Sequence, residues 1–341
     1  MKNRIILFIA ASAVLTVSAG RWTQAQDEPL AGQIRDLVQH EAFRLNLLVQ
    51  SGFRYSLYDD DFQGGRTFEV ANARVSLRGE IDNRFYYRIF VSMGREPNLL
   101  DAYAGYRHSD ALRITAGAMK PSQTADFIPG PHETDFVDRA RITGQLVQSR
   151  EIGLAAEGDI NGFYYYSGIF NGSRLTDNNN NKFYGIGRLQ YTFEDIVPGT
   201  LQVAVSGSHG NSRGIRSGNA GPVLRGERSI YGADVRMETA SILLAAEYLA
   251  GNVEIAEFPD RKEHISGYYL TGGYRFIEST MALVRLQSWG YRERDFRDNQ
   301  LTFGINHDFT GITSFQANID AYFPDVGDNR YGLSLILQVY F

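Results

Sequence analysis

Arginine is the residue whose spacing in this sequence points most directly to chemistry. Arg74 and Arg78 lie four residues apart in one segment, and Arg84 and Arg88 repeat that spacing in the next. In an extended strand, residues two or four apart point to the same side, so each pair shares a face. A guanidinium keeps its charge when partly dehydrated and can bind an oxyanion through two N–H groups. Four cations this close together need anions, so the pattern predicts a surface that attracts anionic solutes.

Cations and carboxylates are mixed in a stretch that interrupts the surrounding pattern, from Ala116 to Ile142. Arginines on strands that faced these carboxylates would create a transverse field, which orients polar solutes and penalises apolar ones. The same arginines could instead pair with strand carboxylates such as Glu69 or Glu157 and fill a wet interior. The cations that we expect to line such an interior are Arg74, Arg78, Arg84, Arg88, Arg113, Lys120, Arg139 and Arg141. The carboxylates expected in the interrupting stretch are Asp126, Glu133, Asp135 and Asp138.

The elements that would position these residues are β-strands. In the segment from Phe43 to Tyr55 the odd positions are almost all apolar, whereas the even ones include Arg44 and Asn46. This period of two is typical of a strand with one face against lipid and the other against water. About sixteen such segments follow one another, and short turns alternate with longer polar linkers such as 210–227 and 252–263. The sequence therefore predicts an all-β fold, a transmembrane antiparallel β-barrel of about 16 strands.

The chain ends on an alternating strand in which every second residue from Tyr331 to Phe341 is apolar. The last residues of a soluble protein usually fray into water, so an apolar strand at this place needs a partner strand and an apolar environment. This ending predicts a barrel in the bacterial outer membrane, in contact with lipid and lipopolysaccharide. We also expect the barrel assembly machinery to recognise the C-terminal strand that ends at Phe341.

The first residues have the pattern of a secretory leader. Met1 to Arg4 provides positive charge, Ile5 to Val17 is apolar, and Thr23 to Ala25 is suitable for cleavage. The apolar stretch is shorter than the roughly 20 residues that a transmembrane helix needs, so an anchor is the weaker alternative. We expect a signal peptide over residues 1–25, a short periplasmic segment over 26–42 and the outer-membrane β-barrel over 43–341.

The composition argues against several other classes of protein. There is no cysteine, so the fold cannot depend on disulfides, and a net charge of −5 argues against a nucleic-acid surface. No stretch has the spacing of a metal site or of a glycine-rich phosphate loop, so we expect no metal and no cofactor. A soluble propeller or a pair of sandwiches would also contain many strands. However, no repeat of about 40 to 50 residues recurs, as propeller blades would require.

The interrupting stretch resembles a motif of the phosphate-selective porin O and P family. That motif opens with G-x-x-K, continues through a proline and closes on F-x-[DE]-R. The matching residues here are Gly117, Lys120, Pro121, Phe136, Asp138 and Arg139. The strand around Leu100–Tyr103 is similar to the family's DAY strand, and the resemblance extends to Phe341.

This resemblance implies a homotrimeric outer-membrane porin whose third long loop folds inward as a constriction. Small polar or anionic solutes would cross it by passive diffusion, with phosphate or polyphosphate among the candidates. The phosphate-binding members carry lysine and arginine at the constriction. This sequence departs from them, because carboxylates such as Asp126 and Glu133 stand beside its cations.

Two other functions of a barrel are alternatives to a channel. A barrel enzyme would need a serine and a histidine close together and oriented by a third group. His209 follows Ser208 and His307 follows Asn306, but neighbours in a strand point to opposite faces, so we expect no enzyme. A structural barrel with a plugged lumen would carry bulky apolar inward residues, which the pattern mostly lacks. A diffusion channel is therefore the favoured function.

Overall fold

The computed structural model describes residues 39–40, 43–57, 65–94, 96–147, 150–176, 181–194, 196–217 and 221–341. The signal peptide expected over residues 1–25 lies outside the described residues, as does most of the segment expected at 26–42. Gln39–His40 forms a short strand, β1, which pairs with the start of β2. Among the described residues, no helix has the length and apolar character needed to cross a membrane.

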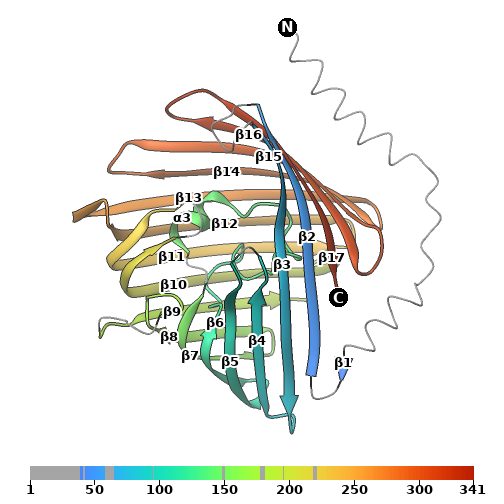
Figure 1. Cartoon of the computed structure of the whole chain (residues 1–341), viewed down its shortest axis with the longest axis vertical. Coiled ribbons are helices and arrows are strands. Elements are labelled where there is room, and N and C mark those ends of the chain that lie inside the picture. The colour runs from blue at the N-terminus through green and yellow to red at the C-terminus, as the bar shows by residue number, and fades with distance from the viewer. Residues whose placement is uncertain are drawn as a thin grey trace.

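One sheet of 17 antiparallel strands curves around a lumen (Figure 1). After β1, the sixteen strands of the barrel are β2 (Phe43–Ser56), β3 (Arg66–Ile81), β4 (Phe85–Ser92), β5 (Asn98–Ser109), β6 (Leu112–Met119), β7 (Glu151–Ile160), β8 (Phe163–Phe170), β9 (Tyr184–Phe193), β10 (Gly199–Arg216), β11 (Val223–Thr239), β12 (Ile242–Ile255), β13 (Phe258–Ile277), β14 (Thr280–Tyr291), β15 (Phe296–Asp308), β16 (Thr313–Pro324) and β17 (Arg330–Tyr340). Each pairs with its neighbours along the chain, and β17 pairs with β2. The ring is closed, which confirms the predicted barrel.

The C-terminal strand closes the barrel against the first strand. Leu335 of β17 lies opposite Phe53 of β2. Beyond the strand, Phe341 and Leu47 exchange two backbone hydrogen bonds of 2.8 and 3.2 Å. Backbone polar groups in lipid must pair within the protein, so pairing to the last residue explains why the apolar alternation runs that far.

Apolar side chains cover the outside of the barrel. On β17, Leu337 is 50% exposed, whereas its neighbours Ile336 and Gln338 point inward and are buried. On β3, Phe68 is 85% exposed. Exposing such an apolar surface to water costs free energy, whereas contact with hydrocarbon does not. The exposed apolar band is therefore the membrane-facing surface. The alternation expected from the sequence is confirmed.

Four neighbouring strands, β10 to β13, are longer than the sequence pattern predicts. Strands occupy most of the stretches 210–227 and 252–263, where the pattern predicts linkers. A strand crosses an outer membrane with about 9–11 residues, so the 20-residue β13 extends beyond the lipid. There, cross-strand neighbours such as Asn211 and Glu227 are polar. The apolar alternation that identifies a strand from sequence therefore disappears.

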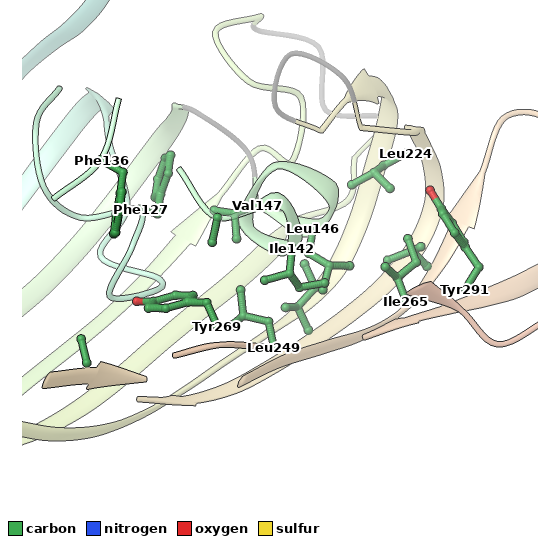
Figure 2. Close-up of a cluster of buried hydrophobic side chains, with 14 of the residues drawn as sticks. Phe127, Phe136, Ile142, Leu146, Val147, Leu224, Leu249, Ile265, Tyr269 and Tyr291 are labelled. Atoms are coloured by element: carbon green, nitrogen blue, oxygen red, sulfur yellow. The ribbon is translucent and has the colours of Figure 1, made fainter. Parts of the chain in front are cut away.

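The segment 120–147, which follows β6, lies inside the barrel. It contains a short helix, α3 (Arg141–Leu146), which packs against β12, β13 and β14. Ile142 and Leu146 are 1% and 0% exposed in a cluster with Leu249 and Ile265 of the wall (Figure 2). The inward face of these strands is therefore partly apolar, which corrects the expectation that the strands mostly lack bulky inward residues.

Candidate functional site

The segment 120–147, the inner segment, is held in the lumen by side chains that bind its backbone. Amide and guanidinium groups of β2 and of β14 to β17 donate to its carbonyl oxygens. These contacts are Gln50 Nε2 to Pro131 O (3.1 Å), Gln338 Nε2 to His132 O (3.4 Å), Gln316 Nε2 to Thr134 O (2.7 Å), Asn306 Nδ2 to Asp135 O (2.9 Å) and Arg285 Nη2 to Asp138 O (3.0 Å). In the other direction, the N–H of Val137 donates to Asn318 at 3.3 Å. Unpaired buried amides are costly, so these strands specify where the segment lies.

An apolar cluster holds the end of the same segment. Leu146 lies over Gly251 of β12, where a Cβ atom would come within 2.9 Å of the Leu146 Cδ2 atom. Phe136 is 2% exposed in this cluster, and the guanidinium of Arg285 lies 4.4 Å from the centre of its ring. Figure 2 shows Phe136 beside Phe127 at one end of the buried cluster and Leu146 on the helix, near Ile142 and Leu249. Polar and apolar contacts together fix the segment against the inner wall of the barrel.

Two of the expected carboxylates join the segment to the wall. Asp138 accepts two hydrogen bonds from Arg54 of β2, at 2.7 and 3.0 Å. Asp135 accepts two from Arg236 of β11, at 2.8 and 3.1 Å. Burial disfavours the charged form of Asp138, but the contact with Arg54 outweighs it and keeps the pKa of this carboxyl below its usual value. These wall arginines are therefore neutralised by the segment itself.

The other two expected carboxylates bind the segment's own backbone. Asp126 Oδ2 accepts the N–H of Ala140 at 3.0 Å, and Glu133 Oε2 accepts the N–H of Gly130 at 2.7 Å. The hydrogen bond from His132, together with this N–H, lowers the pKa of Glu133 to about 2. Both carboxylates stabilise turns. The transverse field that the sequence suggested is accordingly weakened, since the segment's acids are already occupied.

Basic side chains gather on one side of the segment. Lys120, Arg139 and Arg150 line a cavity together with Arg74 of β3. Lys120 Nζ donates to the carbonyl oxygens of residues 128 and 129 at 3.0 and 2.8 Å, and Arg139 donates to those of residues 126 and 129. Within the described part of the chain, Arg74, Lys120 and Arg139 form no ion pair with a carboxylate.

The proximity of these cations changes the titration of the lysine. Burial, followed by the positive charges of Arg139, Arg150 and Arg74, lowers the pKa of Lys120 to about 6. Carbonyl oxygens stabilise its ammonium group directly, whereas Asp101, the carboxylate that favours its charged form, has the smallest effect and forms no ion pair with it. The cavity is therefore short of negative charge, which an anionic solute would supply.

Arg150 and Arg88 share one buried carboxylate. Asp101 of β5 is 2% exposed and lies 3.1 Å from Arg150 Nε and 3.5 Å from Arg88 Nη1. The sequence reasoning did not single out Arg150 or Asp101. For Arg150 the available signal was the continuing run of cations after Arg139, and Asp101 lies in the strand that resembles the DAY motif.

The four arginines expected to form one cluster are divided by the structure. Arg78 lies directly opposite Arg88 in the register of β3 and β4. Arg84 directly precedes β4, in the short turn between β3 and β4, and its N–H donates to the carbonyl oxygen of Ile81. We call the end of the barrel that carries this turn and the other short turns the short-turn rim. Arg74 lies further along β3, opposite Ser92, and joins the cations of the inner segment.

The two remaining expected cations have local partners. Arg113 of β6 pairs with Glu157 of β7 at 3.3 Å. Arg141 donates to Gln300 at 3.3 Å, and its guanidinium lies 4.8 Å from the centre of the Tyr322 ring. Arg113 thus agrees with the alternative of a wet interior filled with ion pairs. The partners of Arg141 are an amide and a ring, which do not neutralise its charge.

Two cavities flank the inner segment. The larger, of about 850 Å³, lies towards the rim with the long loops, because Ser56 and Tyr322 near that rim line it. Its charged lining residues are Arg54, Glu69, Arg74, Lys120, Asp138, Arg139, Arg141, Arg150 and Asp320. The charged residues of the smaller, of about 490 Å³, are Asp126, Glu133, Asp135, Asp138, Arg188, Asp234, Arg236 and Arg285. The two chambers differ in sign, since cations outnumber carboxylates in the first and not in the second.

Comparisons with known proteins agree on one architecture. A family model described as phosphate-selective porin O and P matches residues 43–291. An anion-selective porin from Comamonas acidovorans is 11% identical over 88% of this chain and 99% of its own, with a TM-score of 0.69. The trimer form of OmpT from Vibrio cholerae is 9% identical, with coverages of 88% and 99% and a TM-score of 0.65. The outer membrane channel DcaP of Acinetobacter baumannii is 11% identical, with coverages of 88% and 97% and a TM-score of 0.62. No curated protein matches the sequence. Identities this low carry the fold alone.

Proposed function

The chain belongs to the phosphate-selective porin O and P family, and from this premise we propose that its constriction selects small anions. It is an outer-membrane porin, a channel through which small polar solutes diffuse passively. The observation that supports an anion preference is the placing of Arg74, Lys120 and Arg139 around one cavity without a carboxylate partner. In such a passage, fixed positive charge raises the local concentration of anions and excludes cations.

The inner segment contributes to selection in two ways. Its backbone carbonyls hold Lys120 and Arg139 in place, and its contacts with the wall narrow the lumen. An anion that leaves water there exchanges part of its hydration for guanidinium and ammonium donors. Arg188 pairs with Asp234 at 2.6 Å in the second chamber, so the acids beyond the constriction repel the anion less than their number suggests. Inorganic phosphate is the candidate solute that we infer from family membership.

Planar-bilayer recording of the refolded protein under a salt gradient tests this proposal. We expect stepwise insertions and a reversal potential on the anion side, because chloride crosses the basic constriction more readily than potassium. Added phosphate should reduce the chloride current if it binds there. A cation-sided reversal potential would contradict the anion preference. A control gel should show that the protein is a folded barrel, by its resistance to unfolding. If such protein produced no current steps in the membrane, the result would contradict the channel itself.

Lowering the pH from about 8 to about 5 is expected to raise the ratio of chloride to potassium permeability about twofold. Lys120 gains its charge as the pH falls through about 6. The measurement is the reversal potential in a potassium chloride gradient at each pH. Lys120→Met should abolish most of the difference. Lys182→Met, which alters an exposed lysine outside the barrel strands, is the matched control and should keep it. An unchanged response in Lys120→Met would show that other groups titrate the current.

Several further properties follow as parts of the same proposal. We infer a homotrimer, by analogy with the solved trimer form of a similar barrel, and an exported chain whose residues 1–25 are removed as a signal peptide. We propose that residues 26–42 remain as a short periplasmic segment before the barrel at 43–341. Lipopolysaccharide would contact the exposed apolar band, and the barrel assembly machinery would recognise the strand that ends at Phe341.

We further propose that the chain has no enzymatic activity, since its family and fold are those of a channel. His209 accepts or donates one hydrogen bond with Ser229 at 2.8 Å, but this pair is exposed, on the face of β10 and β11 opposite to the inward Ser208. Ser208 instead bonds to Gln123 of the inner segment at 2.9 Å. Neither serine is thus placed with a histidine in the lumen.

A further inference from the structure

One phenylalanine in the lumen is surrounded by three guanidinium groups. Phe90 lies in the middle of β4 and points inward, directly opposite Asp101 in the register of β4 and β5. The guanidinium carbons of Arg88, Arg150 and Arg74 lie 4.5, 5.7 and 5.8 Å from the centre of its ring. Arg74 comes from β3, Arg88 from β4, and Arg150 directly precedes β7. One ring thus contacts cations from three places in the lumen.

A second phenylalanine has the same relation to the other cations. Phe127 of the inner segment is 7% exposed. The ammonium nitrogen of Lys120 lies 4.5 Å from the centre of its ring, and the guanidinium carbon of Arg139 lies 5.8 Å from it. Five basic side chains of the lumen, those of Arg74, Arg88, Lys120, Arg139 and Arg150, therefore pack against one of two phenyl rings. Asp101 is the one carboxylate that pairs with any of the five in the described part of the chain.

A ring face and a carboxylate hold a cation with opposite effects on a passing anion. A carboxylate fixes an arginine side chain but cancels its charge, as Asp138 does for Arg54 and Glu157 for Arg113. The face of a phenyl ring attracts the cation through its quadrupole and carries no net charge. A guanidinium that lies over a ring also keeps its N–H edges free to donate to an oxyanion.

We propose that Phe90 and Phe127 are positioning residues of the anion filter, which order five basic side chains without adding negative charge beside them. This inference rests on the proposed anion preference and specifies how the protein maintains it. Long cationic side chains that repel one another would otherwise fold away into water and leave the constriction. The two rings keep Arg74, Lys120 and their neighbours directed into the passage, so that an anion meets preorganised donors.

Phe90→Leu tests the proposal because it leaves the charge of the lumen unchanged. If the ring orders the arginines, this variant should lower the anion-to-cation permeability ratio and raise the phosphate concentration for half block of the chloride current, each by about twofold to fivefold. Phe127→Leu should act in the same direction through Lys120 and Arg139. Phe90→Tyr keeps an aromatic face and should restore the wild-type values.

The matched control is Phe303→Leu, which changes a ring that is 54% exposed on the outside of β15 and should leave both quantities unchanged. Wild-type selectivity in both Phe90→Leu and Phe127→Leu would overturn the inference, whereas the anion preference of the wild type would stand. A wild-type channel without anion preference would instead refute the proposed function. Equal losses in Phe90→Leu and Phe90→Tyr would also overturn the inference, because they would trace the effect to packing and not to the ring face.

Discussion

At pH 5, where Lys120 is protonated, replacing Arg74, Lys120 and Arg139 together with glutamine is expected to lower the anion-to-cation permeability ratio about tenfold. A unit charge about 6 Å from an ion in a water-like medium changes its free energy by about 0.7 kcal/mol, or about threefold in occupancy. Three such charges would multiply to about thirtyfold, and screening over a Debye length of about 10 Å at 0.1 M salt reduces this. None of the three has a carboxylate partner in the described structure, so no buried acid is left unpaired by the change.

The reversal potential under a salt gradient measures this effect, and the same total charge can be removed elsewhere as a control. Arg78, Arg84 and Arg275 lie towards the short-turn rim, where Arg275 donates to a carbonyl oxygen of the turn at 3.1 Å. Their replacement by glutamine should lower the ratio by no more than about twofold. Equal effects of the two triple variants would contradict a local filter, because they would show that the total charge of the lumen sets the ion preference.

The barrel could be predicted from the sequence because lipid imposes a simple rule on each strand. A residue such as Leu337 must be apolar because it faces hydrocarbon, while its neighbour Gln338 faces the interior. The rule holds only within the membrane. The upper parts of β10 to β13 have water on their outer face, so residues such as Asn211 carry no apolar signal and the pattern predicts linkers there. Strand length beyond the lipid was therefore not predictable from alternation.

The candidate site was predictable in its residue types and not in its pairings. Lys120 and Arg139 stood out because they interrupt the strand pattern within a motif, and both line one cavity beside the inner segment. Which carboxylate binds which arginine depends on contacts between residues far apart in the chain, such as Asp138 and Arg54. Phe90 gave no signal of its own. In the sequence, an inward aromatic residue that fills space cannot be distinguished from one that packs against cationic side chains.

The apolar part of the lumen was missed for a related reason. Inward residues of β12 and β13 such as Leu249 and Ile265 are 0% exposed, because α3 covers them. Alternation assigns one face of a strand to lipid and the other to water. A strand that is apolar on both faces shows a weaker alternation of apolar and polar residues, which does not reveal that its inner face is covered. Covering by a segment more than a hundred residues away cannot be read from the strand itself.

Replacing Leu146 with aspartate is expected to release the inner segment and raise the single-channel conductance about twofold, with a loss of ion preference. Leu146 is 0% exposed in the apolar cluster and lies against Gly251, where the packing leaves no room for water. Truncating such a residue to alanine costs about 2–5 kcal/mol, and a buried unpaired carboxylate costs more. The strand pairing of the barrel does not involve this side chain, so the segment should leave the wall while the barrel stays closed.

Trypsin added to the reconstituted protein gives a second measurement of the same release. Cleavage after Arg139 or Arg141 should be slow in the wild type, where the backbone of the segment is hydrogen-bonded to the wall, and fast in Leu146→Asp. Leu146→Met is the matched control, because it keeps an apolar side chain of similar volume and should retain wild-type conductance. A folded Leu146→Asp barrel with wild-type conductance and slow cleavage would show that the side-chain amides of β14 to β17 hold the segment without help from the apolar cluster. The constriction would then depend on Gln316 and Asn306, whose hydrogen bonds to the backbone survive the substitution.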